Sequence, residues 1–288
     1  MELENSLLST TRNRYVIFHN STELQYPWED TMSICRFMRV QGILLALTGR
    51  NTERLHSVAK ECEKHGARVM SKVVDVTDAE GMESFINEVD EKLPIDLVIA
   101  NAGITETTAK TKTIEESTRK LFNVNVQGVF NTVLPVIPLM KRRSGQMGRQ
   151  QHICIVSSIA SFMSPLGNSS VYSTTKVAVR QYAEGLRAEL ARDGIGVSAV
   201  CPGYVDSRMT AQNKFHMPLK VGPEVASKKI REGISYNVPY ICFPAVLSGL
   251  GEAVQSIPAM IRHWMTQIGL LRALSLVYKS RKSGSKKE

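Results

Sequence analysis

The stretch from residue 151 to residue 176 reads QHICIVSSIASFMSPLGNSSVYSTTK and contains one change from strand to helix. The run from His152 to Ser157 has an apolar centre of the length of a buried strand, and its last residue, Ser157, is followed by a second serine, Ser158. After a short loop, apolar residues recur at helical spacing from Val171 to Arg192. We therefore expect a strand that passes into a helix, with hydroxyl groups at the carboxyl end of the strand.

The same alternation of short apolar runs and longer amphipathic stretches begins at residue 42. Further strands are expected at Ile43–Leu47, Arg68–Val74, Leu97–Ala100 and Gly196–Cys201, and further helices at Asn51–His65, Asp78–Glu91 and Ile114–Met140. Strands separated by helices of this length pair in parallel through right-handed crossovers. The sequence thus predicts an α/β fold, a doubly wound parallel sheet in a Rossmann-like three-layer sandwich, with ligand sites beyond the carboxyl ends of the strands.

Two parts of the chain depart from this alternation. The N-terminal segment is polar and irregular, although Arg14–Phe18 is a candidate first strand. Residues 203–278 are expected to carry loops and apolar helices rather than another strand–helix unit, and to cover the substrate. The expected organisation is an atypical segment at 1–34, a single Rossmann-like domain at 35–243, an α-helical C-terminal extension at 244–278 and a basic disordered tail at 279–288.

The composition is that of an ordinary soluble protein, with 43% hydrophobic and 22% charged residues. The formal net charge of +9 lies partly in the tail from Lys279 to Lys287. No recognition motif or interleaved aromatic residues accompany it, so we expect no nucleic-acid partner and interpret the tail as solvated or as facing an anionic membrane surface. The chain shows no secretory signal, no run of 18 uncharged apolar residues and no metal-like spacing of its five cysteines. These features predict a protein of a reducing compartment, cytoplasmic or peripheral on an intracellular membrane, without a metal site.

Tyr172 and Lys176 stand four residues apart on the expected helix, so their side chains share one helix face. A phenol with a pKa near ~10 is a poor acid or base at neutral pH. A nearby ammonium group and a helix N-terminus both favour the phenolate, which predicts a lowered tyrosine pKa. Amphipathic helices often contain this spacing by chance, so the surrounding motifs decide its meaning.

Further motifs stand in order around this pair: Asn101-Ala102-Gly103, Asn125 within NVNVQG, Ser157-Ser158, and the run from Pro202 to Ser207. Together they resemble the short-chain dehydrogenase/reductase family over about residues 42–210. The resemblance implies an oxidoreductase that transfers a hydride between a nicotinamide cofactor and a carbonyl or secondary alcohol. It also implies homodimers or homotetramers formed through the helices of Asn125 and Tyr172.

The resemblance assigns a role to each catalytic position. Tyr172 would be the acid/base, and Lys176 would bind the nicotinamide ribose and lower the tyrosine pKa. Ser158 would bind the substrate oxygen; because it lies one residue further from Tyr172 than in many relatives, Ser157 is the alternative. Asn125 would hold a water that links Lys176 to solvent. The expected cofactor contacts are Arg50, Asp75, Val76, Asn101, Ala102, Gly103, Tyr172, Lys176, Pro202, Gly203, Val205 and Ser207.

The residues that follow the expected strand Ile43–Leu47 indicate the cofactor type. An NAD site usually has an acidic residue there, whose carboxylate binds the ribose 2′-hydroxyl. In this sequence Gly49 takes that position, and Arg50 offers a guanidinium group to a 2′-phosphate, which predicts NADP(H) rather than NAD. The alternative is that Arg50 is a surface residue at a helix start. Asp75 matches the adenine-contacting position of the family, or it caps the next helix.

The glycine-rich phosphate loop of the family is missing. Counted back from Gly42, its glycines would fall near Gln25, Glu29 and Thr31, and residues 19–34 contain no glycine. Glycines in such a loop let backbone amides approach a pyrophosphate. Two explanations stay open: a degenerate site in a weak or non-catalytic relative, or an alternative first coding segment joined to a regular family member.

The C-terminal third suggests an apolar substrate and an apolar surface. Met209, Phe215, Met217 and Leu219 would either cover a small lipophilic carbonyl or alcohol or fill a packed lid. Residues Ile257–Tyr278 form an expected amphipathic helix that contains Trp264 and precedes the basic tail. This helix would either contact a membrane surface or pack on the core or a second subunit.

Overall fold

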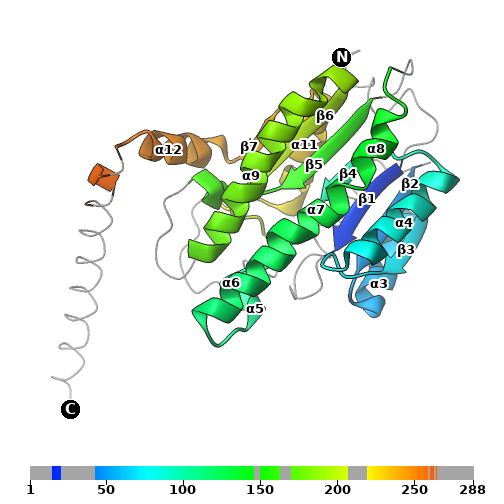
Figure 1. The fold of residues 1–288 in the computed structure, drawn as a ribbon, viewed down its shortest axis with the longest axis horizontal. Coiled ribbons are helices and arrows are strands. Elements are labelled where there is room, and N and C mark those ends of the chain that lie inside the picture. The colour runs from blue at the N-terminus through cyan, green and yellow to red at the C-terminus, as the bar shows by residue number, and fades with distance from the viewer. Residues whose placement is uncertain are drawn as a thin grey trace.

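Seven parallel strands form one sheet in the computed structural model, which describes residues 15–20, 43–145, 150–162, 170–206, 219–258, 260–262 and 264 (Figure 1). The strands are β1 (Tyr15–Asn20), β2 (Leu44–Gly49), β3 (Arg68–Val73), β4 (Leu97–Ala100), β5 (Gln151–Val156), β6 (Ile195–Pro202) and β7 (Tyr240–Phe243). Their order in the sheet is β3-β2-β1-β4-β5-β6-β7, and every pair is parallel. The chain thus winds outward in one direction from β1 to β3 and in the other direction from β4 to β7, which confirms the doubly wound α/β fold.

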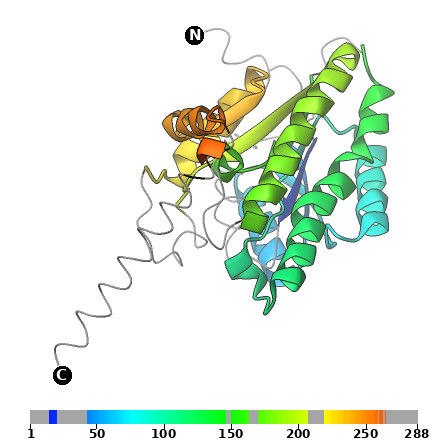
Figure 2. The same ribbon diagram turned by 60° about the vertical axis from the view of Figure 1, so that its left-hand side comes forward.

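Helices cover both faces of this sheet. They are α3 (Thr52–Lys64), α4 (Ala79–Lys92), α5 (Glu106–Ala109), α6 (Ile114–Phe122), the π-helix η2 (Asn123–Gln127), α7 (Gly128–Val133), α8 (Val136–Lys141), the 3₁₀-helices η3 (Ile159–Phe162) and η5 (Ala191–Asp193), α9 (Ser170–Leu190), α11 (Pro223–Ser235) and α12 (Ala245–Gln255). One core packs α4, α6, α7, α8 and α9 on the sheet, and a second core packs α3 and α11 on the opposite face. Figure 2 shows α9 and α11 on opposite sides of the sheet.

The apolar spacing that predicted the helices also explains how they pack. In α4, for example, the apolar residues Met82, Phe85, Ile86 and Val89 recur along one face and are all buried in the first core. Asp78 accepts a hydrogen bond from the backbone amide of Gly81 and so caps this helix. The strands and helices expected from residue 42 to residue 202 are therefore confirmed, with bounds that shift by one or a few residues.

The expectation that residues 203–278 hold no further strand–helix unit is wrong. After β6 the chain forms α11 and then β7, which pairs in parallel with β6. Ala226, Ile230 and Ile234 of α11 are buried against the second core. The strand was missed because four residues with two buried positions are too short to show a period. The extension begins afterwards with α12, which contacts β7 and η3.

The strand β1 lies inside the sheet and pairs with β2 on one side and with β4 on the other. Its bounds, Tyr15–Asn20, confirm the candidate first strand Arg14–Phe18. The sheet therefore takes a strand from the segment 1–34, which was expected to lie outside the Rossmann-like domain. The positions expected for the phosphate loop, the tail at 279–288 and most of Ile257–Tyr278 lie outside the described residues. None of the helices in the described ranges is long and apolar enough to cross a bilayer.

Candidate active site

The α9 helix brings Tyr172 and Lys176 to the carboxyl end of β5. The ammonium nitrogen of Lys176 lies 5.8 Å from the centre of the Tyr172 ring and donates a hydrogen bond to the carbonyl of Val156 at 2.9 Å. The phenol of Tyr172 is hydrogen-bonded to the side chain of Ser158. The structure therefore places a phenol, a hydroxyl and an ammonium group together at one strand end, as the sequence predicted.

The pKa of Tyr172 moves in the opposite direction from the one expected. Burial of the phenol raises its pKa, the hydrogen bond with Ser158 lowers it, and the negative charge of Glu106 raises it again. The nearby Lys176 does not bring the pKa of Tyr172 back below its usual value. Burial lowers the pKa of Lys176 itself to about 8. Tyr172 is thus fully protonated at neutral pH, and its partner ammonium group is close to losing its proton.

The two serines at the end of β5 have different partners. Ser157 is buried, and its hydroxyl donates to the backbone carbonyl of Lys176 at 2.7 Å. Ser158 faces Tyr172, and its hydroxyl oxygen also accepts a hydrogen bond from the amide of Ala160 at 3.1 Å. The hydroxyl of Ser157 therefore anchors α9 to the sheet, whereas that of Ser158 lies beside the phenol.

Asn125 lies in the π-helix η2 and is fully buried. Its Oδ1 accepts from the amide of Ile104 at 2.7 Å, while Nδ2 donates to the Ile104 carbonyl at 2.9 Å and to the Thr175 hydroxyl at 3.0 Å. These bonds connect three segments: the loop after β4, the η2 turn and α9. Asn125 therefore fixes the loop and the helix relative to each other, and the water expected at this residue stays a prediction.

The loop Asn101-Ala102-Gly103 follows β4 and reaches the same site. A Cβ atom added to Gly103 would lie 3.1 Å from the ammonium nitrogen of Lys176 and 3.5 Å from Oδ1 of Asn125. A glycine leaves room here for the lysine head group, which would have to shift to accommodate a larger residue. The expected neighbours Gly103, Asn125 and Lys176 are thus brought together.

The segment after β6 also ends at this edge of the sheet. The amide of Gly203 donates to the carbonyl of Phe243 at 2.8 Å, and Val205 pairs with Val221. Pro202 and Val205 line a cavity of about 60 Å³ together with Ile99, Asn101, Val156 and residues of α11. Of the expected contacts in this segment, Ser207 lies outside the described residues.

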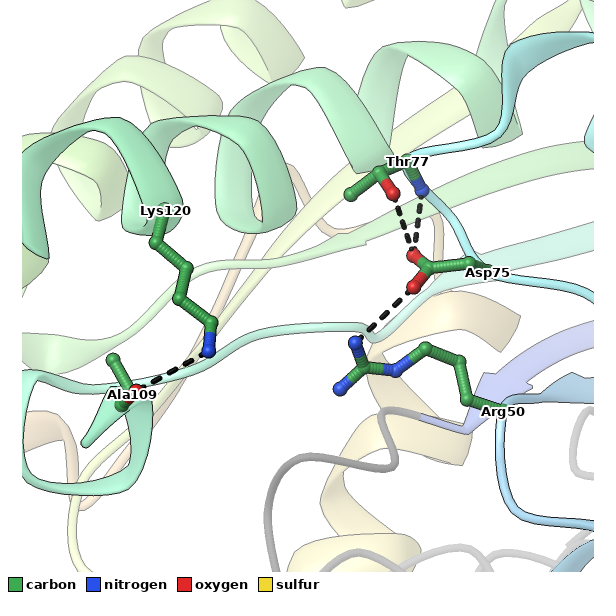
Figure 3. Close-up of polar contacts among 5 residues, drawn as sticks. All are labelled: Arg50, Asp75, Thr77, Ala109 and Lys120. Atoms are coloured by element: carbon green, nitrogen blue, oxygen red, sulfur yellow. Dashed lines mark hydrogen bonds and ion pairs between the residues drawn. The ribbon is translucent and has the colours of Figure 1, made fainter. Parts of the chain in front are cut away.

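A second group of expected residues lies at the ends of β2 and β3. Arg50 donates from Nη1 to Oδ2 of Asp75 at 3.1 Å, and the other carboxylate oxygen accepts from the amide and the hydroxyl of Thr77, both at 2.9 Å (Figure 3). Burial raises the pKa of Asp75, but the Thr77 hydrogen bonds and Arg50 outweigh it and hold the pKa below its usual value. Asp75 thus orders the turn after β3, and the cap of α4 is Asp78 instead. Figure 3 also shows Lys120 of α6 donating to the carbonyl of Ala109 at 3.2 Å.

The family description "short chain dehydrogenase" matches residues 32–217, which is more than half of the chain. This chain belongs to the short-chain dehydrogenase/reductase family. The family consists of oxidoreductases that use a nicotinamide cofactor. An uncharacterized oxidoreductase of Staphylococcus saprophyticus is 31% identical to this short-chain dehydrogenase/reductase over 194 residues, which cover 67% of this chain and 80% of that protein. An uncharacterized oxidoreductase of Myxococcus xanthus is 31% identical over 205 residues, which cover 71% and 79% of the two chains.

Solved structures share the fold at lower sequence identity. A short chain dehydrogenase/reductase from Burkholderia phymatum in complex with NAD has a TM-score of 0.69 and 20% identity, and the match covers 82% of this chain and 91% of that one. An alcohol dehydrogenase from the archaeon Thermococcus sibiricus complexed with 5-hydroxy-NADP has a TM-score of 0.65 and 21% identity, with 80% and 96% covered. These likenesses confirm the Rossmann-like architecture of this short-chain dehydrogenase/reductase.

The described residues fit a nicotinamide dinucleotide at both of its ends. At the nicotinamide end, Gly103 leaves space beside the Lys176 ammonium that a side chain would fill. At the adenosine end, the side chain of Arg50 is 30% exposed directly after β2. The segment expected to hold the pyrophosphate lies outside the described residues. Arg50 and Lys176 are therefore the positive groups that we expect to hold the two ends of the cofactor.

Glu106 was not predicted from the sequence. It is the first residue of α5, and its Oε1 accepts from the backbone amide of Tyr172 in the first turn of α9 at 2.8 Å. A carboxylate at this position satisfies an amide that has no partner within the helix and interacts favourably with the helix dipole. Because 66 residues separate Glu106 from Tyr172, no local pattern in the sequence could have found this contact.

Proposed function

We propose that this protein transfers a hydride between NADP(H) and the carbonyl or secondary alcohol of a small lipophilic compound, with Tyr172 as the acid/base. The observation that carries the proposal is the hydrogen bond between Tyr172 and Ser158 beside the buried ammonium of Lys176. A bound nicotinamide supplies or accepts the hydride. The side chains of this chain then have to bind the substrate oxygen and move one proton.

The raised pKa of Tyr172 favours the reductive direction at neutral pH. A protonated phenol can donate its proton to an oxygen that gains negative charge, while the Ser158 hydroxyl donates a hydrogen bond to the same oxygen. The resulting phenolate is stabilised by Ser158 and by the cation of Lys176, which lies over the ring. Positioned proton transfer of this kind contributes about 10²–10⁴-fold to a rate.

The preference for NADP(H) is supported by Gly49 and Arg50. Gly49 offers no carboxylate to a ribose 2′-hydroxyl, and Arg50 has a partly exposed guanidinium group at the end of β2. Asp75 binds one nitrogen of this group. A planar guanidinium has five N–H donors, so it can hold Asp75 and a phosphate at the same time.

The test is NADPH oxidation by the full chain with a series of aliphatic and aromatic ketones of increasing apolar size. Tyr172→Phe is expected to lower kcat by at least about 10²-fold. Tyr182→Phe is the matched control on the same helix, and it should keep wild-type activity because its ring packs against Phe130 and the first core. Equal activity of the Tyr172→Phe variant and the wild type would contradict the proposed role.

A second function is favoured by the missing glycines and by an exposed apolar face on α12. Val246, Leu250 and Val254 recur every four residues on that helix and are 64%, 57% and 37% exposed, and Trp264 further on is 65% exposed. A non-catalytic relative would use this face for an interaction at a membrane surface.

Two measurements test this second function. A non-catalytic relative would show no thermal stabilisation by millimolar NADPH, whereas a cofactor-binding enzyme would be stabilised. Vesicles with anionic lipid should recover the wild type but not the full chain carrying Leu250→Ser and Trp264→Ser.

Self-association through the helices of Asn125 and Tyr172 is also part of the proposal. Ile114 and Phe122 of α6 and Val177 of α9 are exposed apolar residues on these helices. Burying them against a second copy would remove apolar surface from water. Sedimentation of the full chain tests this, since a monomer at micromolar concentration would contradict it.

A further inference from the structure

Two cysteines lie opposite each other on the last two strands of the sheet. Cys201 of β6 is paired in register with Cys242 of β7. Both pack against the core on the α9 side of the sheet, whereas Ile241 and Phe243 pack on the opposite side. Neighbouring strands lie roughly 4.8 Å apart, which is within the range of about 4.4–6.8 Å between the Cα atoms of a disulfide. The backbone thus places two free thiols at the separation that a disulfide requires.

The two thiols are in direct contact and differ in acidity. They form a hydrogen bond with each other, and this bond is the main cause that lowers the pKa of Cys242 and raises the pKa of Cys201. Cys242 is half-buried, whereas Cys201 is fully buried. Cys242 is therefore the sulfur that both loses its proton more readily and can be reached from outside.

The surrounding side chains favour a negative sulfur. The positive charge of Arg180, from α9, lowers the pKa of both cysteines, and the hydroxyl of Ser248, from α12, is hydrogen-bonded to Cys242. Glu252 of α12 is the negative group that faces Cys242 and opposes this effect. Nε of Arg180 is buried and has no hydrogen-bond partner among the described residues. The guanidinium is held in place by the ring of Phe162, at 4.4 Å from its centre.

We propose that Cys201 and Cys242 are a site of reversible oxidation, at which a peroxide converts the two thiols into a disulfide that joins β6 to β7. The Cys242 thiolate attacks one peroxide oxygen, the O–O bond breaks, and hydroxide leaves and is protonated to water. The Cys201 sulfur then attacks the resulting sulfenic acid, an S–S bond forms, the S–O bond breaks, and the proton of Cys201 leaves in a second water. Two thiols are oxidised and one hydrogen peroxide is reduced to two waters.

The site lies next to the catalytic residues, so oxidation would change their surroundings. Cys201 directly precedes Pro202-Gly203 at the expected nicotinamide end. A disulfide would tie the strand before this segment to β7. The proposal itself needs only the thiol pair, and it does not rest on the proposed dehydrogenase function.

The test is peptide mapping of the full wild-type chain after treatment with a small excess of hydrogen peroxide. Digestion with trypsin releases Cys201 in the peptide of residues 193–208 and Cys242 in the peptide of residues 232–262. We expect these two peptides to be joined by a disulfide, with a mass two hydrogens below the sum of the two peptide masses. They should separate after reduction with dithiothreitol. The dithiol reagent phenylarsine oxide, added before the peroxide, should prevent the link.

Two variants separate the pair from the other thiols. Cys154→Ser should keep the link, because Cys154 is fully buried in β5 and burial raises its pKa to about 12. Cys201→Ser should leave Cys242 as a sulfenic acid that dimedone traps. The proposal is overturned if Cys242 of the wild type reacts with dimedone and stays unlinked, or if it links to Cys154 instead of Cys201.

Discussion

At the scale of single residues, the two adjacent serines at the end of β5 have separate tasks. Ser158 contacts the phenol of Tyr172, and Ser157 contacts the backbone of α9. Ser158→Ala is therefore expected to lower kcat by about 10²-fold or more with little change in stability. Ser157→Ala should instead lower the free energy of unfolding by about 1 kcal/mol and leave kcat nearly unchanged. Steady-state kinetics and urea unfolding of both variants check this, and a reversed pattern would show that Ser157 is the substrate-binding residue.

The lowered pKa of Lys176 has a measurable effect on stability. The ammonium form is disfavoured in the folded state, so the folded chain loses this proton near pH 8, whereas the unfolded chain keeps it to about pH 10.5. Between these values the unfolded state binds more protons, and stability contributed by this residue rises with pH. Relative to Lys176→Met, the wild type should gain on the order of 1 kcal/mol in unfolding free energy from pH 7.5 to pH 9. A constant difference over this range, measured by urea unfolding, would contradict the assignment.

At the scale of secondary structure elements, Glu106 links the start of α5 to the first turn of α9. It both accepts the Tyr172 amide and raises the pKa of the Tyr172 phenol. Glu106→Gln keeps an acceptor and removes the charge, so the alkaline limb of the pH–rate profile should move to lower pH while stability is kept. Glu106→Ala removes both and should also lower the free energy of unfolding by about 1 kcal/mol. If neither variant shifts the pH profile, Glu106 has only a structural role.

The loop after β4 provides a second test at this scale. Gly103→Ala puts a methyl group 3.1 Å from the Lys176 ammonium, so the lysine has to move. We expect a loss of activity and of NADPH affinity of about tenfold or more in a chain that still folds. Gly249→Ala is the matched control, because this exposed glycine of α12 has no neighbouring atom within 4 Å. That variant should keep full activity and be more stable by up to about 1 kcal/mol.

The sequence predicted those parts of the site that depend on local spacing. The pair Tyr172 and Lys176 follows from one helix turn, and the strand ends follow from apolar runs. Three features depend on contacts between distant segments and could not be predicted in this way. These are the choice between Ser157 and Ser158, the bond from Glu106, and the raised pKa of Tyr172, which burial decides.

At the scale of the whole molecule, β1 is predicted to be among the most protected parts of the chain. All six of its residues pair with β2, and Val16, Ile17 and Phe18 also pair with β4. Amides in a central strand exchange with solvent only when the sheet opens. Hydrogen exchange measured by mass spectrometry should therefore show residues 15–20 as protected as β2 and β4. Fast exchange of this segment would show that it is not part of the sheet in solution.

The position of β1 also limits which shortened forms of this protein could exist. A product that starts after residue 20 would keep β2 and β3 as one pair and β4 to β7 as another group, with nothing between them. Each group would present an open edge of unpaired amides and carbonyls, which is a template for aggregation. Any alternative first exon that yields a working enzyme must therefore encode a strand of its own at this place, whatever else it changes in the phosphate loop.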